Sequence, residues 1–350
     1  MKKSVVMILT LAMLLMLFAG CAGTPVVYYS DCTCPAGSHS AVAEQPEPTD
    51  APAVSEGAVK TGLYIGTGIT TTDATAEADG SAEYDVTLAA VLVDDNGVIV
   101  DCVIDSIGAT VNFDTTGAIT SDIAAEVLTK NEKGDNYGMV AYGGAVAEWY
   151  EQADALAKYA VGKTVEELKN GAIDETGYAA DADLATSATI YLGGYVNAIA
   201  SAVEAAEHLG AQAGDELVLS TVNTLASSTT GTAELDVDAV ALTKNGDVIT
   251  SCFIDALQAK AAIDETGAAS VANDQTKNTL GYDYGMVAYA GAAYEWFEQA
   301  ASFAQYVTGK TADEVAGIAV SEGKAADADL ASSVTIAIGG FQALIAKAAQ

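Results

Sequence analysis

The sequence predicts an α+β protein that contains two tandem homologous domains. Three observations support this prediction. One block of motifs occurs twice in the same order, each copy opens with alternating apolar and polar residues around a glycine turn, and each copy closes with an apolar helix. We therefore expect each domain to combine a β-hairpin or small antiparallel sheet with packed helices and a C-terminal helix.

The internal repeat is visible in four segments whose separation stays between 146 and 150 residues. The matching segments are 135–142 and 282–289, 148–153 and 295–300, 161–164 and 308–311, and 180–185 and 326–331. Because the copies are colinear, we define a first repeat (58–208) and a second repeat (209–350). We expect each to hold a core and to fold on its own.

The elements of each repeat follow from local patterns. Alternating residues on both sides of Asp95-Asn-Gly97 predict a hairpin over 85–105, and the Asn245-Gly246 turn predicts its counterpart over 235–255. Apolar residues at helical spacing predict the remaining elements. These are helices near 145–159 and 290–306, short helices at 164–169 and 311–316, and final helices near 190–207 and 336–349.

The first 20 residues have the pattern of an export signal. Lys2 and Lys3 precede an apolar run over 5–18, which is too short to span a bilayer. The segment Leu17-Phe18-Ala19-Gly20-Cys21 resembles the lipobox of bacterial lipoproteins, with Phe18 where the family usually has Leu. The resemblance implies lipid attachment at Cys21 and anchoring on the extracytoplasmic face of the cell membrane. The alternative is an ordinary secretory signal.

Residues 21–57 are predicted to form a disordered tether. All five prolines of the chain fall by position 52, among Ser, Thr, Glu and Asp residues. Such a segment buries too little apolar surface to offset the entropy of ordering it. Cys32 and Cys34 lie here, and their role stays open. The composition changes near Lys60, where the first repeat begins.

Charge and residue content exclude several classes of function. The chain carries 48 acidic and 14 basic residues, a net charge of −34, which excludes nucleic acid as a partner. His39 and His208 have no counterparts in the repeat, so we predict neither catalytic residues nor a metal site. Cys102 and Cys252 lie in predicted strands and are expected to be small buried apolar residues.

A hydroxyl-rich segment precedes the final helix of each repeat. In the first repeat, Asp183, Thr186, Ser187, Ala188 and Thr189 resemble the motif recognised by the transferase that esterifies FMN onto threonine. The resemblance implies that Thr189 accepts the flavin and that the other four residues are its recognition context. In the second repeat it implies Thr335 as the acceptor, with Val334 in place of the family's Ala. The corresponding recognition residues are Asp329, Ser332 and Ser333.

The whole chain resembles the flavinylated FMN-binding-domain lipoproteins of Gram-positive extracellular electron transfer. This implies up to two covalent FMN groups and a flavin transferase as partner. It also implies an electron donor and an electron acceptor that the sequence does not identify. An electron carrier is then favoured over a substrate-transforming enzyme. The alternative is a surface binding or adhesion lipoprotein whose duplicated domain holds no cofactor.

Physical chemistry adds expectations about the acceptor segment. A phosphate on Thr189 would meet free N–H groups if this residue starts the final helix. The glycine pairs at 193–194 and 339–340 would allow a flat ring or another helix to approach the backbone closely. Alternatively, Asp183 only caps a buried helix.

The aromatic residues of the predicted middle helices leave two alternatives open. Trp149, Tyr150, Trp296 and Phe297, with the Tyr-Gly-Met turns at 137–139 and 284–286, either line the flavin or pack in the core. Glu148 and Glu295 are expected on exposed helix faces.

Overall fold

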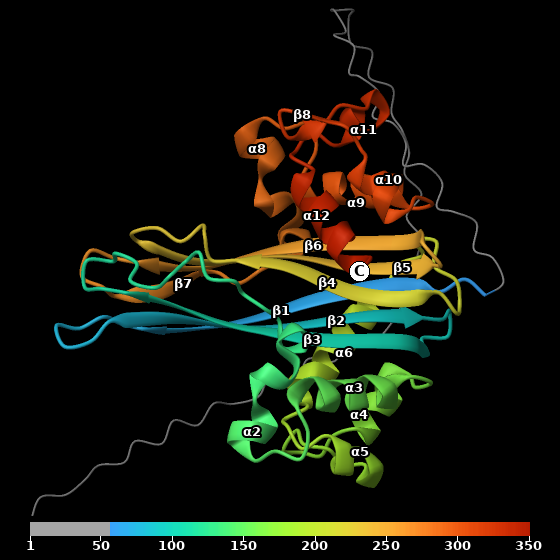
Figure 1. Cartoon of the computed structure of the whole chain (residues 1–350), viewed down its shortest axis with the longest axis horizontal. Helices are drawn as coiled ribbons and strands as arrows, with labels where there is room; N and C mark the ends of the chain where they lie inside the picture. Colours follow the sequence, from blue (N-terminus) through green and yellow to red (C-terminus); the bar gives the residue numbers. More distant parts are fainter. Residues whose placement is uncertain (1–56) are drawn as a thin grey trace, which may run out of the picture. The chain divides into compact units, whose positions relative to one another are not determined.

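The computed structural model describes residues 57–350, which lie in one compact unit beginning at Asp50. The predicted signal peptide, Cys21 and the tether as far as residue 56 lie outside the described residues. From residue 57 onward the protein is α+β, with antiparallel sheets and packed helices (Figure 1). In this range no helix has the length and apolarity needed to cross a membrane.

The first repeat opens with a three-stranded antiparallel sheet in the order β1-β2-β3. Its strands are β1 (Lys60–Thr72), β2 (Gly80–Val93) and β3 (Ile99–Phe113). The β2–β3 pair confirms the predicted hairpin. Its turn is closed by the Asp94 carboxylate, which accepts hydrogen bonds from the N–H groups of Asn96 and Val98, and Gly97 supplies the positive φ of 78° that the turn requires.

Helices cover one face of this sheet. They are α1 (Lys130–Lys133), the 3-10 helix η1 (Gly134–Tyr137), α2 (Met139–Gly143), α3 (Trp149–Ala160), α4 (Val165–Gly171), α5 (Ala182–Ser187) and α6 (Gly193–Glu204). Leu156 of α3 and Ile199 of α6 are fully buried against Val91 of β2 in a core between helices and sheet. The predicted helices near 145–159, 164–169 and 190–207 are therefore confirmed.

The second repeat has the same order of elements, with three short strands added. Its sheet, β4-β5-β6-β7, contains β4 (Glu216–Thr224), β5 (Thr232–Asn245), β6 (Val248–Ile263) and β7 (Ala269–Asn273). Its helices are α7 (Lys277–Leu280), η2 (Gly281–Tyr284), α8 (Met286–Ala290), α9 (Trp296–Val307), α10 (Ala312–Ala316), α11 (Ala328–Ser333) and α12 (Gly339–Ala348). A two-stranded ribbon, β8 (Val320–Ser321) with β9 (Lys324–Ala325), precedes α11.

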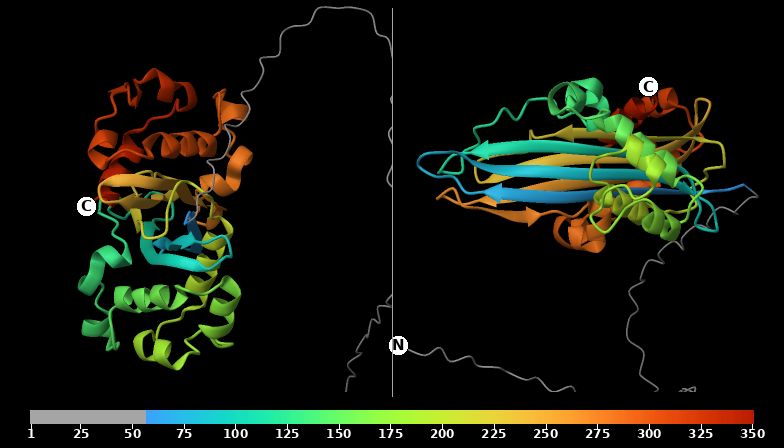
Figure 2. Two further views of the ribbon diagram at one scale, coloured as in Figure 1. Left: turned by 90° about the vertical axis from the view of Figure 1, so that its right-hand side faces the viewer. Right: turned by 90° about the horizontal axis from the view of Figure 1, so that it is seen from below.

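The two larger sheets pack face to face, with the helices of each repeat on the outer faces (Figures 1 and 2). A third core fills the space between the sheets, and both repeats contribute to it. Its members include Tyr84, Leu88, Ile107, Leu235, Val237 and Leu257, all at most 1% exposed. Each repeat therefore holds a core of its own, as expected, but one apolar face of each sheet is buried only by the other repeat.

Candidate functional site

Each predicted acceptor threonine is held by a buried glutamine. The Gln152 Oε1 atom accepts three hydrogen bonds, from Thr189 N (2.7 Å), Thr189 Oγ1 (3.2 Å) and Ile190 N (3.1 Å). Gln152 lies on α3 and is 0% exposed, and its Nε2 donates to the Ala147 carbonyl at 2.8 Å. The contact with Ala147 therefore fixes the orientation of the amide, and the amide oxygen accepts from Thr189 and Ile190.

The same contacts recur in the second repeat. Gln299 Oε1 accepts from Thr335 N (2.8 Å), Thr335 Oγ1 (3.1 Å) and Ile336 N (3.2 Å). Its Nε2 donates to the Tyr294 carbonyl at 2.9 Å, and Gln299 is also 0% exposed. We call each set of contacts a glutamine clamp. It fixes the backbone and the hydroxyl of both predicted acceptors.

The helices that carry the clamps are positioned by buried glutamates. Glu148 is the N-cap of α3 and forms a capping box with Glu151. Its two carboxylate oxygens also accept from the N–H groups of Met139 (2.8 Å) and Val140 (2.9 Å), at the start of α2. A carboxylate at these helix starts meets otherwise unpaired donors.

Glu295 makes the equivalent contacts with Met286 and Val287. The prediction that Glu148 and Glu295 are exposed is wrong, since they are 5% and 1% exposed. Helical periodicity places both glutamates outside the apolar face. It cannot show that backbone N–H groups of another helix bind their carboxylates and bury them.

The tryptophans form part of a second repeated arrangement, a lysine held against two rings. The Lys130 ammonium lies 5.1 Å from the centre of the Trp149 ring and 5.4 Å from that of Tyr137. In the second repeat, Lys277 lies 4.8 Å from Trp296 and 5.4 Å from Tyr284. Such geometry is favourable for a cation over an aromatic face. We call these residues the lysine–aromatic clusters.

Each tryptophan also joins its cluster to the start of the final helix. Trp149 donates through Nε1 to the Tyr195 hydroxyl at 3.2 Å, while Trp296 packs edge-on against Phe341. Both tryptophans are members of the core between helices and sheet. Of the two alternatives for the aromatic residues, packing in the core therefore describes Trp149 and Trp296. Tyr150 instead donates to Asp135 at 3.2 Å on the surface.

The recognition residues lie on the short helices α5 and α11. Asp183 and Asp329 are exposed in the first turns, whereas the N-caps are Asp181 and Asp327. The alternative that Asp183 is the capping residue is therefore wrong. Thr186 and Ser332 are exposed, and their hydroxyls donate to the carbonyls three residues earlier.

Three further predicted residues end these helices. Ser187 is exposed, and Ser333 donates to the Leu330 carbonyl at 3.4 Å. Ala188 and Val334 are the C-caps, and both are buried, at 1% and 0% exposure. The fold therefore places the larger Val334 side chain in the core at the position that Ala188 occupies.

The acceptors do not start the final helices, contrary to expectation. Thr189 precedes the first residue of α6 by four positions, and Thr335 precedes that of α12 by the same interval. The N–H groups of Thr189 and Ile190 are taken by Gln152, so they are not free to bind a phosphate. The expected anion site at the acceptor is wrong, because a side chain from another helix satisfies these donors.

The first acceptor is open to solvent on its side-chain face. Thr189 is exposed and Thr335 half-buried. Among the described residues, no atom lies within 4 Å of the position that a Cβ on Gly194 would take. An oriented hydroxyl on an exposed threonine, with open space at the following Gly194 and a lysine over Trp149, fits a phosphoester-linked aromatic group. The residues present are therefore compatible with FMN.

The two cysteines in the described part of the chain belong to neither the glutamine clamps nor the lysine–aromatic clusters. Cys102 and Cys252 are free and buried, as predicted, and burial raises the pKa of both thiols, that of Cys252 to about 12. Each lines a cavity between the sheet and the long helix, of about 500 Å³ in the first repeat and about 290 Å³ in the second. Within residues 57–350 no group of His, Cys, Asp or Glu side chains could hold a metal.

Sequence reasoning missed the glutamines and the lysines. Both were visible as identities between the repeats, in Glu151-Gln152-Ala153 against Glu298-Gln299-Ala300 and in Lys130-Asn131 against Lys277-Asn278. Their roles depend on contacts between distant segments. No family model matches the chain, and comparisons with curated proteins and with solved structures found no match.

Proposed function

We propose that the chain is a lipid-anchored surface electron carrier with two homologous domains, each bearing FMN esterified to a threonine. The acceptors are Thr189 and Thr335. The observation that carries the proposal is the glutamine clamp, which occurs at both acceptor hydroxyls with the same three donors.

The clamp supports an acceptor role because it goes beyond what helix capping requires. Capping of α5 and α11 is already provided by Asp181 and Asp327. A buried amide that orients a partly accessible hydroxyl restricts the threonine to one geometry, which lowers the entropic cost of presenting it to a modifying enzyme. The exposed carboxylates of Asp183 and Asp329 are available for recognition by that enzyme.

When bound, FMN would supply the redox chemistry, while the protein holds the group and sets its environment. The residues in a position to do so are the acceptor threonine, the glutamine clamp and the adjoining lysine–aromatic cluster. Lys130 and Lys277 supply positive charge next to aromatic surface in a protein that contains no arginine. They would favour the accumulation of negative charge on a neighbouring group.

The test is intact mass spectrometry of residues 57–350 coexpressed with a flavin transferase and supplied with FAD. The expected product carries two FMN groups, each added with loss of water. Thr189→Ala and Thr335→Ala should each lose one, and the double variant should lose both. Thr115→Ala, an exposed threonine in the loop after β3 and outside the recognition motif, is a matched control for hydroxyl loss. Wild-type protein without added mass would favour the alternative, a binding or adhesion lipoprotein without cofactor.

Anchoring is a separate part of the proposal and rests on the apolar run that ends at Cys21. In the full-length chain, Cys21→Ser should leave unprocessed precursor and abolish labelling with a radioactive fatty acid. Cys32→Ser should leave processing and labelling unchanged. Normal labelling of the Cys21 variant would contradict the lipoprotein assignment.

A further inference from the structure

The two lysine–aromatic clusters differ in the acidic residues around them. Asp238 lies on β5 directly opposite Ala256, and the equivalent position on β2, opposite Ser106, is Thr87. The pKa of Asp238 is raised by burial, while Lys277 acts in the opposite direction. Burial lowers the pKa of Lys277, and among the nearby carboxylates Asp238 opposes this most. The second repeat therefore contains a half-buried carboxylate near its lysine where the first has a hydroxyl.

Asp238 also reaches the acceptor side of the second repeat. Its Oδ2 lies 3.7 Å from the position that a Cβ on Gly340 would take, in the first turn of α12, five residues after Thr335. At the corresponding Gly194 no described atom lies within 4 Å. A carboxylate therefore lies near Gly340 in the second repeat, and the corresponding Gly194 has no such neighbour among the described residues.

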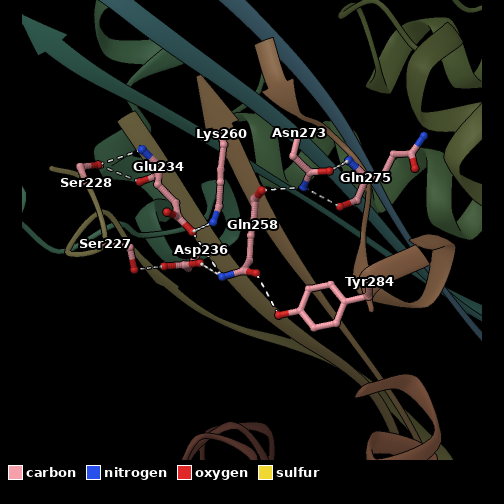
Figure 3. Close-up of polar contacts among 9 residues, drawn as sticks. All are labelled: Ser227, Ser228, Glu234, Asp236, Gln258, Lys260, Asn273, Gln275 and Tyr284. Carbon is pink, nitrogen blue, oxygen red and sulfur yellow. Dashed lines mark hydrogen bonds and ion pairs between the residues drawn. The ribbon is translucent and has the colours of Figure 1, made fainter. Parts of the chain in front are cut away.

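Further carboxylates are linked to the second cluster through Tyr284. Its hydroxyl donates to Gln258 Oε1 at 3.1 Å (Figure 3). Gln258 Nε2 in turn approaches Glu234 Oε1 at 3.3 Å and Asp236 Oδ1 at 3.4 Å. Lys260 pairs with Glu234 at 3.1 Å, which leaves Asp236 and Asp238 to face Lys277.

The first cluster has a second lysine, and α1 carries Glu132 where α7 of the second repeat has Thr279. Lys133 joins Lys130 against Tyr137, with its ammonium 6.0 Å from the ring centre. The strand carboxylates Glu83 and Asp85 are exposed to solvent, although Asp85 still raises the pKa of Tyr137. Each repeat has one further buried acid, Asp105 or Asp255, so this residue does not distinguish them.

Resting on the proposed function, we propose that Asp238 makes the two flavin sites unequal and gives the site at Thr335 the lower reduction potential. A carboxylate disfavours the gain of negative charge on a neighbouring group, and the effect is large where water is excluded.

The first experiment measures the two sites separately. Thr189→Ala and Thr335→Ala proteins, each shown by mass to carry one FMN, are titrated spectroelectrochemically. The flavin on Thr335 should have the lower midpoint potential. Equal potentials, or the reverse order, would overturn the inference and leave the proposed function intact. A variant that gains no FMN mass would instead count against the proposed function at the remaining site.

Charge variants then test Asp238 itself. Asp238→Asn in the Thr189→Ala background should raise the potential of the remaining flavin towards that of the first site. Thr87→Asp in the Thr335→Ala background should lower the midpoint potential of the flavin on Thr189. This variant tests the same effect of charge if Asp238→Asn fails to fold.

The matched control is Asp247→Asn, at the exposed turn of the same hairpin. It lies beyond Asn245, the end of β5, which is seven residues or roughly 20 Å along the strand from Asp238. It should leave the potential unchanged. A shift as large as that of Asp238→Asn would show that net charge, not position, sets the difference.

Discussion

The two repeats place equivalent acidic residues in opposite environments. Glu83 and Asp85 on β2 are exposed, while Glu234 on β5 is 5% exposed and Asp236 is half-buried. The cause lies across the hairpin. Opposite the first pair stand Thr110 and Gly108, and opposite the second pair stand Lys260 and Gln258. Ser227, in the loop before β5, also donates to Asp236 (Figure 3).

The difference shows that the cross-strand partner decides whether a strand carboxylate is a solvated surface group or part of a network. Burial raises the pKa of Glu234, and Lys260 opposes that rise. The acceptor region did not diverge in this way, since the glutamine clamp, the glutamate cap and the lysine–aromatic cluster are present twice. The predictions below test how far the two repeats are equivalent.

The largest effect should come from separating the repeats. Residues 57–208 or 209–350 alone would expose the sheet face that the other half buries, including Leu88 or Leu235. At about 25 cal/mol per Å² of apolar surface, loss of such a face exceeds the stability of a typical domain. Circular dichroism and size-exclusion chromatography should show unfolded or self-associated halves, and a folded whole. Two cooperative monomeric halves would contradict the shared core.

Removal of a clamp should come next. Gln152→Ala and Gln299→Ala each leave two backbone donors and a hydroxyl without their acceptor, and we expect a loss of about 2–4 kcal/mol in the free energy of unfolding. The loss should be larger for Gln299, because Thr335 is less exposed than Thr189 and water replaces the contacts less well. Urea titration of both variants checks this. A loss no larger than that of the surface variant Gln275→Ala would show that the clamp does not stabilise the fold.

Asp255 should make stability depend on pH. Burial raises its pKa from the ordinary 3.8 to about 6, although its carboxylate accepts from Ala256 N and Asn278 N. The native state therefore binds the proton more readily than the unfolded state between pH 4 and 6. This contribution, on the order of 2 kcal/mol, is present below pH 4 and is lost as the pH rises through 6.

The measurement is urea unfolding at pH 5 and pH 7 for wild type and Asp255→Asn. The wild type should gain more stability at pH 5 than the variant does. Asp247→Asn should behave like the wild type. Identical pH dependence in wild type and Asp255→Asn would show that this carboxyl keeps its ordinary pKa in the fold.

The smallest effect separates capping from recognition on α5. Asp181→Ala removes the side chain that accepts from Asp183 N and Leu184 N, and should cost about 1 kcal/mol. Asp183→Ala should leave stability unchanged within about 0.5 kcal/mol and reduce FMN incorporation at Thr189. Thermal unfolding and intact mass measure the two effects. If Asp183→Ala is the more destabilising variant, its proposed role in recognition fails.

Much of the fold was predictable because its signals are local. Alternation around Asp95-Asn-Gly97 and helical spacing from Trp149 to Tyr159 each depend on a few neighbouring residues. The shared core was less evident. Its signal was the run Leu88–Val93, apolar on both faces of β2 and fully buried, which indicates a strand covered on both sides.

The site was predictable only in part. The motif around Thr189 could be proposed from its residues, but the partner of its hydroxyl lies 37 residues earlier on another helix. The burial of Glu148 was missed for the same reason, since the donors to its carboxylate are backbone N–H groups of α2. Contacts of this kind depend on tertiary packing, and single-chain periodicity does not encode them.

The face-to-face sheets also determine the order of events in folding. The Thr61 and Ser251 hydroxyls meet at 2.6 Å across 190 residues, beside apolar contacts of similar sequence separation. Such contacts form late, because a long stretch of chain must be closed before they are made. A chain that emerges from its N-terminus therefore presents the inner face of the first sheet, unpaired and apolar, until β6 has appeared. Over that interval we expect the first repeat to be prone to aggregation, and the second repeat to end this exposure by covering the sheet.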